Sequence, residues 1–114
     1  MLKKYLKNFL KSMKVTISNT AEKDIKNIYD YILEKTKSSE FALKYYTRLM
    51  NAVFSLQSFP KRCPLVIFEP ERGLGIRRLQ IDRYNIFYIV GENRITVINI
   101  LHSSSDIESK LGWN

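Results

Sequence analysis

The segment from Gly75 to His102 constrains the fold of this chain more than any other stretch. It contains three apolar runs rich in isoleucine, valine, tyrosine and phenylalanine, which is the composition of β-strands. Two residues separate the first run from the second, and three residues separate the second from the third. Breaks this short make hairpins rather than crossovers. The sequence therefore predicts an antiparallel meander with strands at Ile76–Ile81, Tyr84–Val90 and residues 94–101.

Alternation assigns the side chains of these strands to two faces. In the second strand Tyr84, Ile86, Tyr88 and Val90 share one face of the predicted sheet. In the third strand Ile98, Ile100 and His102 are predicted to share a face, opposite Val97, Asn99 and Leu101.

Upstream of the meander, the pattern predicts a short strand at residues 14–18 and two amphipathic helices. Asn19 is the expected N-cap of the first helix, with Glu22 completing a capping box, and this helix should end near Lys35. Ser38 or Ser39 should cap the second helix, and Pro60 should end it at or before Phe59. The apolar positions at helical spacing are Ala21, Ile25, Ile28, Tyr29 and Ile32, then Ala42, Tyr45, Tyr46, Leu49, Val53 and Leu56.

These elements predict an α+β domain with the order β-α-α-β-β-β. The short link between the helices makes them an antiparallel hairpin, which should pack on one face of a small, mostly antiparallel sheet. Residues 61–74 are expected to form a loop, and residues 103–111 a short closing helix. The other face of the sheet should stay partly open, and an open face lined by side chains is where a binding site is expected.

Composition sets further bounds on the chain. Its 114 residues suit one domain, and the net charge of +8 predicts a polyanionic or acidic partner. The single Cys63 excludes an internal disulfide and fits a reducing, cytoplasmic compartment. The longest uncharged run, residues 49–60, is far shorter than the roughly 18–20 residues of a membrane span.

The first 13 residues are predicted to be a separate basic, amphipathic extension of a domain at residues 14–114. They contain four lysines and no acidic residue. Three interpretations stay open: a helix that packs on the domain or on a partner, an extension of the gene model upstream of the true start, or a membrane-surface helix. The apolar residues recur at helical spacing: Leu2, Tyr5, Leu6, Phe9, Leu10 and Met13.

The sequence contains few motifs that indicate catalysis or ligand binding. It contains no glycine-rich phosphate loop and no metal-ligand cluster, so we expect neither cofactor nor metal. A basic and aromatic set on the meander is the remaining candidate, because guanidinium groups bind phosphate and aromatic rings stack bases. Each member also has a structural interpretation: exposed arginines are commonly solvated, and strand tyrosines and histidines commonly belong to the core. The set comprises Arg77, Arg78, Arg83, Tyr84, Tyr88 and His102.

Two ordered patterns in the chain resemble a known family. The first is Val15-x-Ile17-Ser18-x-x-Ala21-x-x-Asp24-Ile25-x-x-Ile28-x-x-Tyr31-Ile32, followed by Ala42, Leu56 and Pro60. The second is Arg77-x-Leu79-x-Ile81-x-x-Tyr84-x-Ile86-x-Tyr88-x-Val90, then Ile98-x-Ile100-x-His102-x-x-x-Asp106. Their combination resembles the RelE/ParE toxin superfamily over about residues 14–111.

The resemblance implies a toxin of a bacterial type II toxin–antitoxin module, of the kind associated with plasmid stabilisation, which inhibits growth. Its partner would be a small cognate antitoxin that wraps the toxin, and contact with operon DNA would run only through the antitoxin. A basic toxin also suits an acidic antitoxin segment.

The superfamily divides by target, and its two branches imply different chemistry for this chain. In the RelE-like branch, which cuts mRNA on the ribosome without a metal, the resemblance makes Arg77 and Arg83 the cations and His102 or Tyr84 the acid or base. The ParE-like branch inhibits DNA gyrase and has no such catalytic set. Serines follow His102 where many cleaving relatives have arginines, so this chain is interpreted as closer to ParE-like members. A non-toxic nucleic-acid-binding module is the further alternative.

Overall fold

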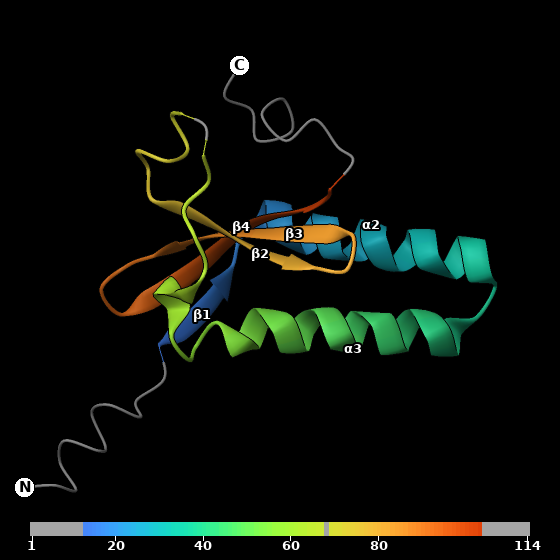
Figure 1. Cartoon of the computed structure of the whole chain (residues 1–114). Coiled ribbons are helices and arrows are strands. Elements are labelled where there is room, and N and C mark those ends of the chain that lie inside the picture. The colour runs from blue at the N-terminus through green and yellow to red at the C-terminus, as the bar shows by residue number, and fades with distance from the viewer. Residues whose placement is uncertain (1–12, 68, 104–114) are drawn as a thin grey trace, which may run out of the picture.

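The structure is a computed structural model that describes residues 13–67 and 69–103. Its elements confirm the predicted α+β class and the order of strands and helices (Figure 1). The predicted helices at residues 1–13 and 103–111 lie outside the described residues, apart from Met13 and Ser103. The elements are β1 (Lys14–Ile17), α2 (Asn19–Thr36), α3 (Ser39–Ser55), the 3-10 helix η1 (Pro60–Arg62), β2 (Ile76–Ile81), β3 (Tyr84–Val90) and β4 (Arg94–His102).

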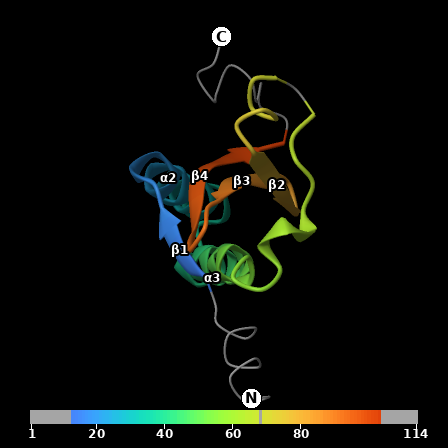
Figure 2. The same cartoon turned by 90° about the vertical axis from the view of Figure 1, so that its left-hand side faces the viewer.

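The four strands form one sheet in the order β1-β4-β3-β2. The meander β2-β3-β4 is antiparallel, as predicted, whereas β1 joins the outer edge of β4 in parallel. A parallel pair needs a crossover between its strands, and here the helical hairpin supplies the start of that connection. Figure 2 shows the sheet between the hairpin on one side and the loop before β2 on the other.

Local capping explains where the helices begin and end. Ser18, rather than the predicted Asn19, is the N-cap of α2, and its hydroxyl accepts a hydrogen bond from the Ala21 amide at 3.0 Å. Ser38 caps α3 in the same way, as one of the two predicted alternatives. Helix α3 ends at Ser55, four residues before Phe59, and a short turn then leads into η1 at Pro60.

The start of α2 completes the outer edge of β4, where β1 has already ended. The Ser18 amide donates to the Val97 carbonyl and its hydroxyl donates to the Ile98 carbonyl, both at 2.9 Å. Two residues further along β4, the Ile100 amide donates to Asp24 Oδ2 at 2.9 Å. The N-cap serine and an aspartate on α2 therefore take the place of a longer first strand, because buried strand-edge groups need partners.

The sequence assigned Val97 and Ile98 of the third strand to the wrong faces of the sheet. Tyr88 pairs with Val97 and Phe87 pairs with Asn99, so a β-bulge leaves Ile98 without a cross-strand partner. The extra residue reverses the alternation. As a result Val97 lies with Ile100 in the core under the helices, whereas Ile98 packs on the opposite face with Phe87.

Two apolar clusters lie on the two faces of the sheet. The larger one fills the space between the helices and the sheet and includes Leu49, Ile86 and Tyr88. The smaller one, centred on Phe87 and Ile76, is covered by Val66 from the loop before β2. The face that was predicted to be partly open is therefore covered at one end by this loop. Among the described residues, no helix is long and apolar enough to cross a membrane.

Candidate functional site

Three of the four predicted site residues meet at one end of the sheet. Tyr84 begins β3 and pairs with His102 at the end of β4, and their rings contact edge to face with centroids 5.3 Å apart. Arg83 lies in the turn just before Tyr84, and its carbonyl accepts a hydrogen bond from the Ser103 amide at 2.7 Å. Its side chain is exposed. This end of the sheet thus holds an imidazole, a phenol and a guanidinium on adjacent positions.

Helix α3 brings further groups to the same end. The Tyr45 ring contacts the Tyr84 ring at 5.9 Å between centroids. One turn along, the guanidinium of Arg48 donates from Nε and Nη2 to both carboxylate oxygens of Asp82, at 2.8 and 3.0 Å. Such a two-point pair fixes the geometry of both planar groups. The β2-β3 turn is therefore tied to α3, and we call Tyr45, Arg48, Asp82, Tyr84 and His102 the sheet-end cluster.

The phenols of this cluster hold their protons at neutral pH. The pKa of Tyr45 is raised from 10.0 to about 12, first by burial and then by the neighbouring Asp82 carboxylate. Burial also raises the pKa of Tyr84. Asp82 is the opposite case, since the hydrogen bond from Arg48 holds its pKa below the ordinary value. A phenol that keeps its proton at neutral pH is a poor general base.

Arg77, the fourth predicted site residue, lies elsewhere. It pairs with Tyr88, which is four residues along β3 from Tyr84, so about 13 Å separate Arg77 from the sheet-end cluster. Its guanidinium donates to the Cys63 carbonyl at 2.6 Å and to the Lys61 carbonyl at 3.4 Å. The hydroxyl of Tyr88 donates to the Pro60 carbonyl at 2.6 Å. This cross-strand pair therefore fastens η1 to the sheet.

Three members of the sheet-end cluster leave no signal in the sequence. Tyr45 fits the apolar stripe of its helix, and Asp82 is an ordinary turn residue. Arg48 and Asp82 are 34 positions apart, so nothing local links them. In the described part of the chain, no group of three histidine, cysteine or acidic side chains is placed to hold a metal ion.

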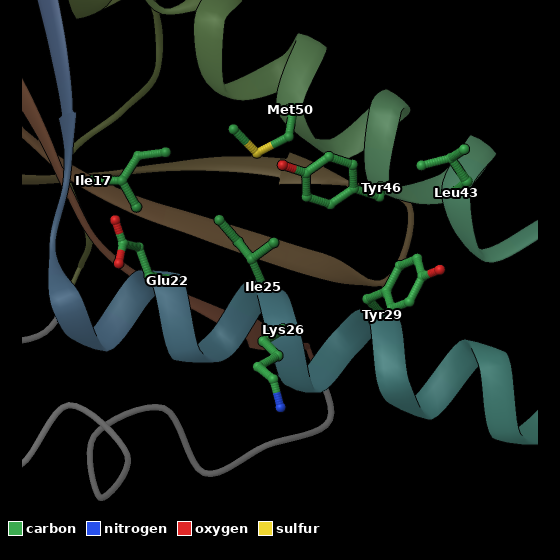
Figure 3. Close-up of a pocket in the computed structure, with 8 residues that line it drawn as sticks. All are labelled: Ile17, Glu22, Ile25, Lys26, Tyr29, Leu43, Tyr46 and Met50. Atoms are coloured by element: carbon green, nitrogen blue, oxygen red, sulfur yellow. The ribbon is translucent and has the colours of Figure 1, made fainter. Parts of the chain in front are cut away.

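A second surface feature is an apolar groove of about 550 Å³ between the two helices. Figure 3 shows Ile17 and Glu22 at one end of it and Tyr29 and Leu43 at the other. The rings of Tyr29 and Tyr46 meet edge to face across the groove, with centroids 6.4 Å apart. Its remaining walls are Ile25, Lys26 and Met50.

Two solved structures share this fold. A structure titled "Chromosomal ParDE TA system from P. aeruginosa" is similar with a TM-score of 0.66 and 22% identity, covering 80% of this chain and 96% of that one. The toxin–antitoxin complex RelBE2 from Mycobacterium tuberculosis is similar with a TM-score of 0.60 and 14% identity, covering 84% and 97%. At these identities the likeness concerns the fold.

The family itself follows from the sequence match. The model of the ParE toxin of the type II toxin–antitoxin system parDE matches residues 15–107. The chain belongs to the ParE toxin family, within the RelE/ParE superfamily that its two patterns resemble. A search among curated proteins finds no match.

Proposed function

We propose that this chain arrests bacterial growth by acting on DNA gyrase and that a cognate antitoxin neutralises it. The match to the ParE family over residues 15–107 carries this proposal. The geometry supports it, because the four groups that the cleaving branch would require are divided between two places. Arg77 binds backbone carbonyls near η1, about 13 Å along the strands from the level of Tyr84 and His102. In this proposal the chain acts by binding its target, in the cytoplasm and without a cofactor.

The antitoxin partner is proposed on two grounds. The two similar structures are titled as toxin–antitoxin systems. The net charge of +8 also suits an acidic partner segment, since opposite charges steer association and select partners. Contact with operon DNA would then run through the antitoxin.

Ribosome-dependent cleavage of mRNA is the second candidate, and one observation favours it. The His102 ring contacts the Tyr84 ring, and the backbone of the exposed Arg83 is bonded to that of Ser103, so one end of the sheet carries both an imidazole and a guanidinium. Cleavage through the ribose 2′-hydroxyl needs such a base and such charge stabilisation.

Induction in a bacterial host distinguishes these functions, with plasmid supercoiling and mRNA 5′ ends measured from one culture. Gyrase inhibition predicts growth arrest with relaxed plasmid and intact mRNA, and arrest that persists in His102→Ala. New mRNA ends that disappear in His102→Ala and Arg83→Ala, but not in the matched surface control Arg94→Ala, would refute gyrase inhibition and establish cleavage. No arrest from a folded, expressed chain would leave a nucleic-acid-binding module.

A further inference from the structure

We infer that the groove between α2 and α3 is the docking site of this chain's own residues 1–12, which bind it as an amphipathic helix. The inference concerns a surface and a segment that the proposed function does not use.

Helix α3 has a second apolar stripe beside its core face. The core face buries Ala42, Leu49 and Val53. The second stripe consists of Leu43, Tyr46, Met50 and Phe54, whose spacing of three and four residues places them in one row. Leu43 is 57% exposed and Phe54 is 47% exposed, and every member of the row except Phe54 lines the groove. Tyr46 contacts Tyr29 and Met50 packs partly on the core, but much of the row stays exposed. A contiguous row of exposed apolar side chains commonly marks a binding surface.

The described chain begins at the right place to reach this row. Met13 packs against the main core, and β1 starts beside the C-terminal end of α3 in both views (Figures 1 and 2). A helix of 12 residues is about 18 Å long, and the row from Leu43 to Phe54 spans about 16 Å. A helix that leads into Met13 can therefore lie along the whole row.

The first residues carry the pattern that such a surface requires. Their apolar positions recur at helical spacing and end with Phe9, Leu10 and Met13. Their four lysines fall on the opposite side, where they stay in water, and Glu22 at one end of the groove offers a nearby carboxylate. A tethered segment has an effective concentration in the millimolar range, so it outcompetes a second copy or a weak partner for the same groove.

Photo-crosslinking of the full-length chain tests this docking. Phe9→benzoylphenylalanine places a photoreactive group on the apolar face, and Lys7→benzoylphenylalanine is the matched control on the polar face. We expect the Phe9 probe to crosslink within one chain to peptides containing Tyr46 or Met50, with at least tenfold lower yield from Lys7. Mass spectrometry locates the crosslinks, and the readout needs neither toxicity nor a target.

Each other result would overturn the inference. Crosslinks only between chains would assign the groove to a second copy. Crosslinks to another surface, or equal yields from Phe9 and Lys7, would mean that the segment does not use the groove. As a second measurement, deletion of residues 1–12 should raise the fluorescence of bound anilinonaphthalene sulfonate severalfold while the far-UV circular dichroism keeps its shape. Unchanged fluorescence from the folded truncated chain would show that the segment never covered the apolar row.

Discussion

Asp24 is predicted to stabilise the fold by its hydrogen bond to the edge of β4 rather than by its charge. Its Oδ2 accepts from the Ile100 amide at 2.9 Å, and from the Asn99 side chain at 3.4 Å. Ile100 is 2% exposed, so Asp24→Ala leaves the Ile100 amide without a hydrogen-bond partner where water does not reach it. A hydrogen bond to a charged group together with an unsatisfied donor is worth about 2 kcal/mol. For a chain of this length that corresponds to a thermal midpoint about 8 °C lower.

Asp24→Asn isolates the contribution of the charge. The amide oxygen can still accept from the Ile100 amide, so this variant should lose less than about 1 kcal/mol. Asp30→Ala is the matched control, because Asp30 lies on the same helix and its pair with Lys26 is exposed. Calorimetry or chemical denaturation gives the three midpoints. The reasoning is refuted if Asp24→Ala is no less stable than Asp24→Asn, or no less stable than Asp30→Ala.

The pH dependence of the same comparison checks the sign of the electrostatic effect. Burial is the largest influence on Asp24 and raises its pKa above 3.8, although the two hydrogen bonds oppose this shift. The folded state therefore binds the proton more tightly than the unfolded state does. Relative to Asp24→Asn, the wild-type chain should gain stability as the pH falls through the raised pKa toward 3.8, and lose it as the pH rises. A constant difference across this window would contradict the assignment.

Four further predictions follow from the contacts. Arg77→Ala should cost about 1–3 kcal/mol, measured by urea denaturation, because the Cys63 carbonyl loses its donor. Arg48→Ala should lower the thermal midpoint much less than Arg77→Ala does, since water screens the exposed pair with Asp82. Tyr45 should titrate near pH 12 in an absorbance titration compared with Tyr45→Phe, and stability should fall as the pH rises through 10 to 12 because the folded phenol keeps its proton longer. Deletion of residues 1–12 should leave a cooperatively folding domain, and non-cooperative melting of the truncated chain would show that the segment belongs to the core.

The sequence was sufficient to predict the meander and the hairpin of helices, because both depend on local periodicity and on short connections. It was insufficient at Ile98, where β4 has a single-residue bulge. A bulge arises from the pairing of two strands, so the apolar–polar alternation within one strand does not reveal it. The N-cap was misplaced by one residue for a similar reason. Ser18 is selected over Asn19 because its hydroxyl bonds both the Ala21 amide and the Ile98 carbonyl, which is 80 positions away.

The candidate site was predictable only as a list of residue types. Adjacency in the meander brought Arg83, Tyr84 and His102 together, because short hairpins fix the register. Arg77 has the same chemistry and lies on the same strand pair, but its place near η1 depends on how the loop at residues 61–63 returns to the sheet. Loops of this kind have no periodicity to interpret, so the sequence could not separate an anchoring arginine from one that faces a substrate.

Helix α3 connects the groove with the sheet-end cluster. Tyr45 contacts Tyr84 in the cluster, whereas the next residue, Tyr46, lines the groove and contacts Tyr29. Successive residues on a helix point about 100° apart, so any movement of α3 toward an occupant of the groove also moves Tyr45. We therefore expect the imidazole resonances of His102 to shift when the groove changes occupancy. Comparing the full-length chain with the chain lacking residues 1–12 by NMR measures this coupling, and identical His102 resonances would show that the two surfaces act independently.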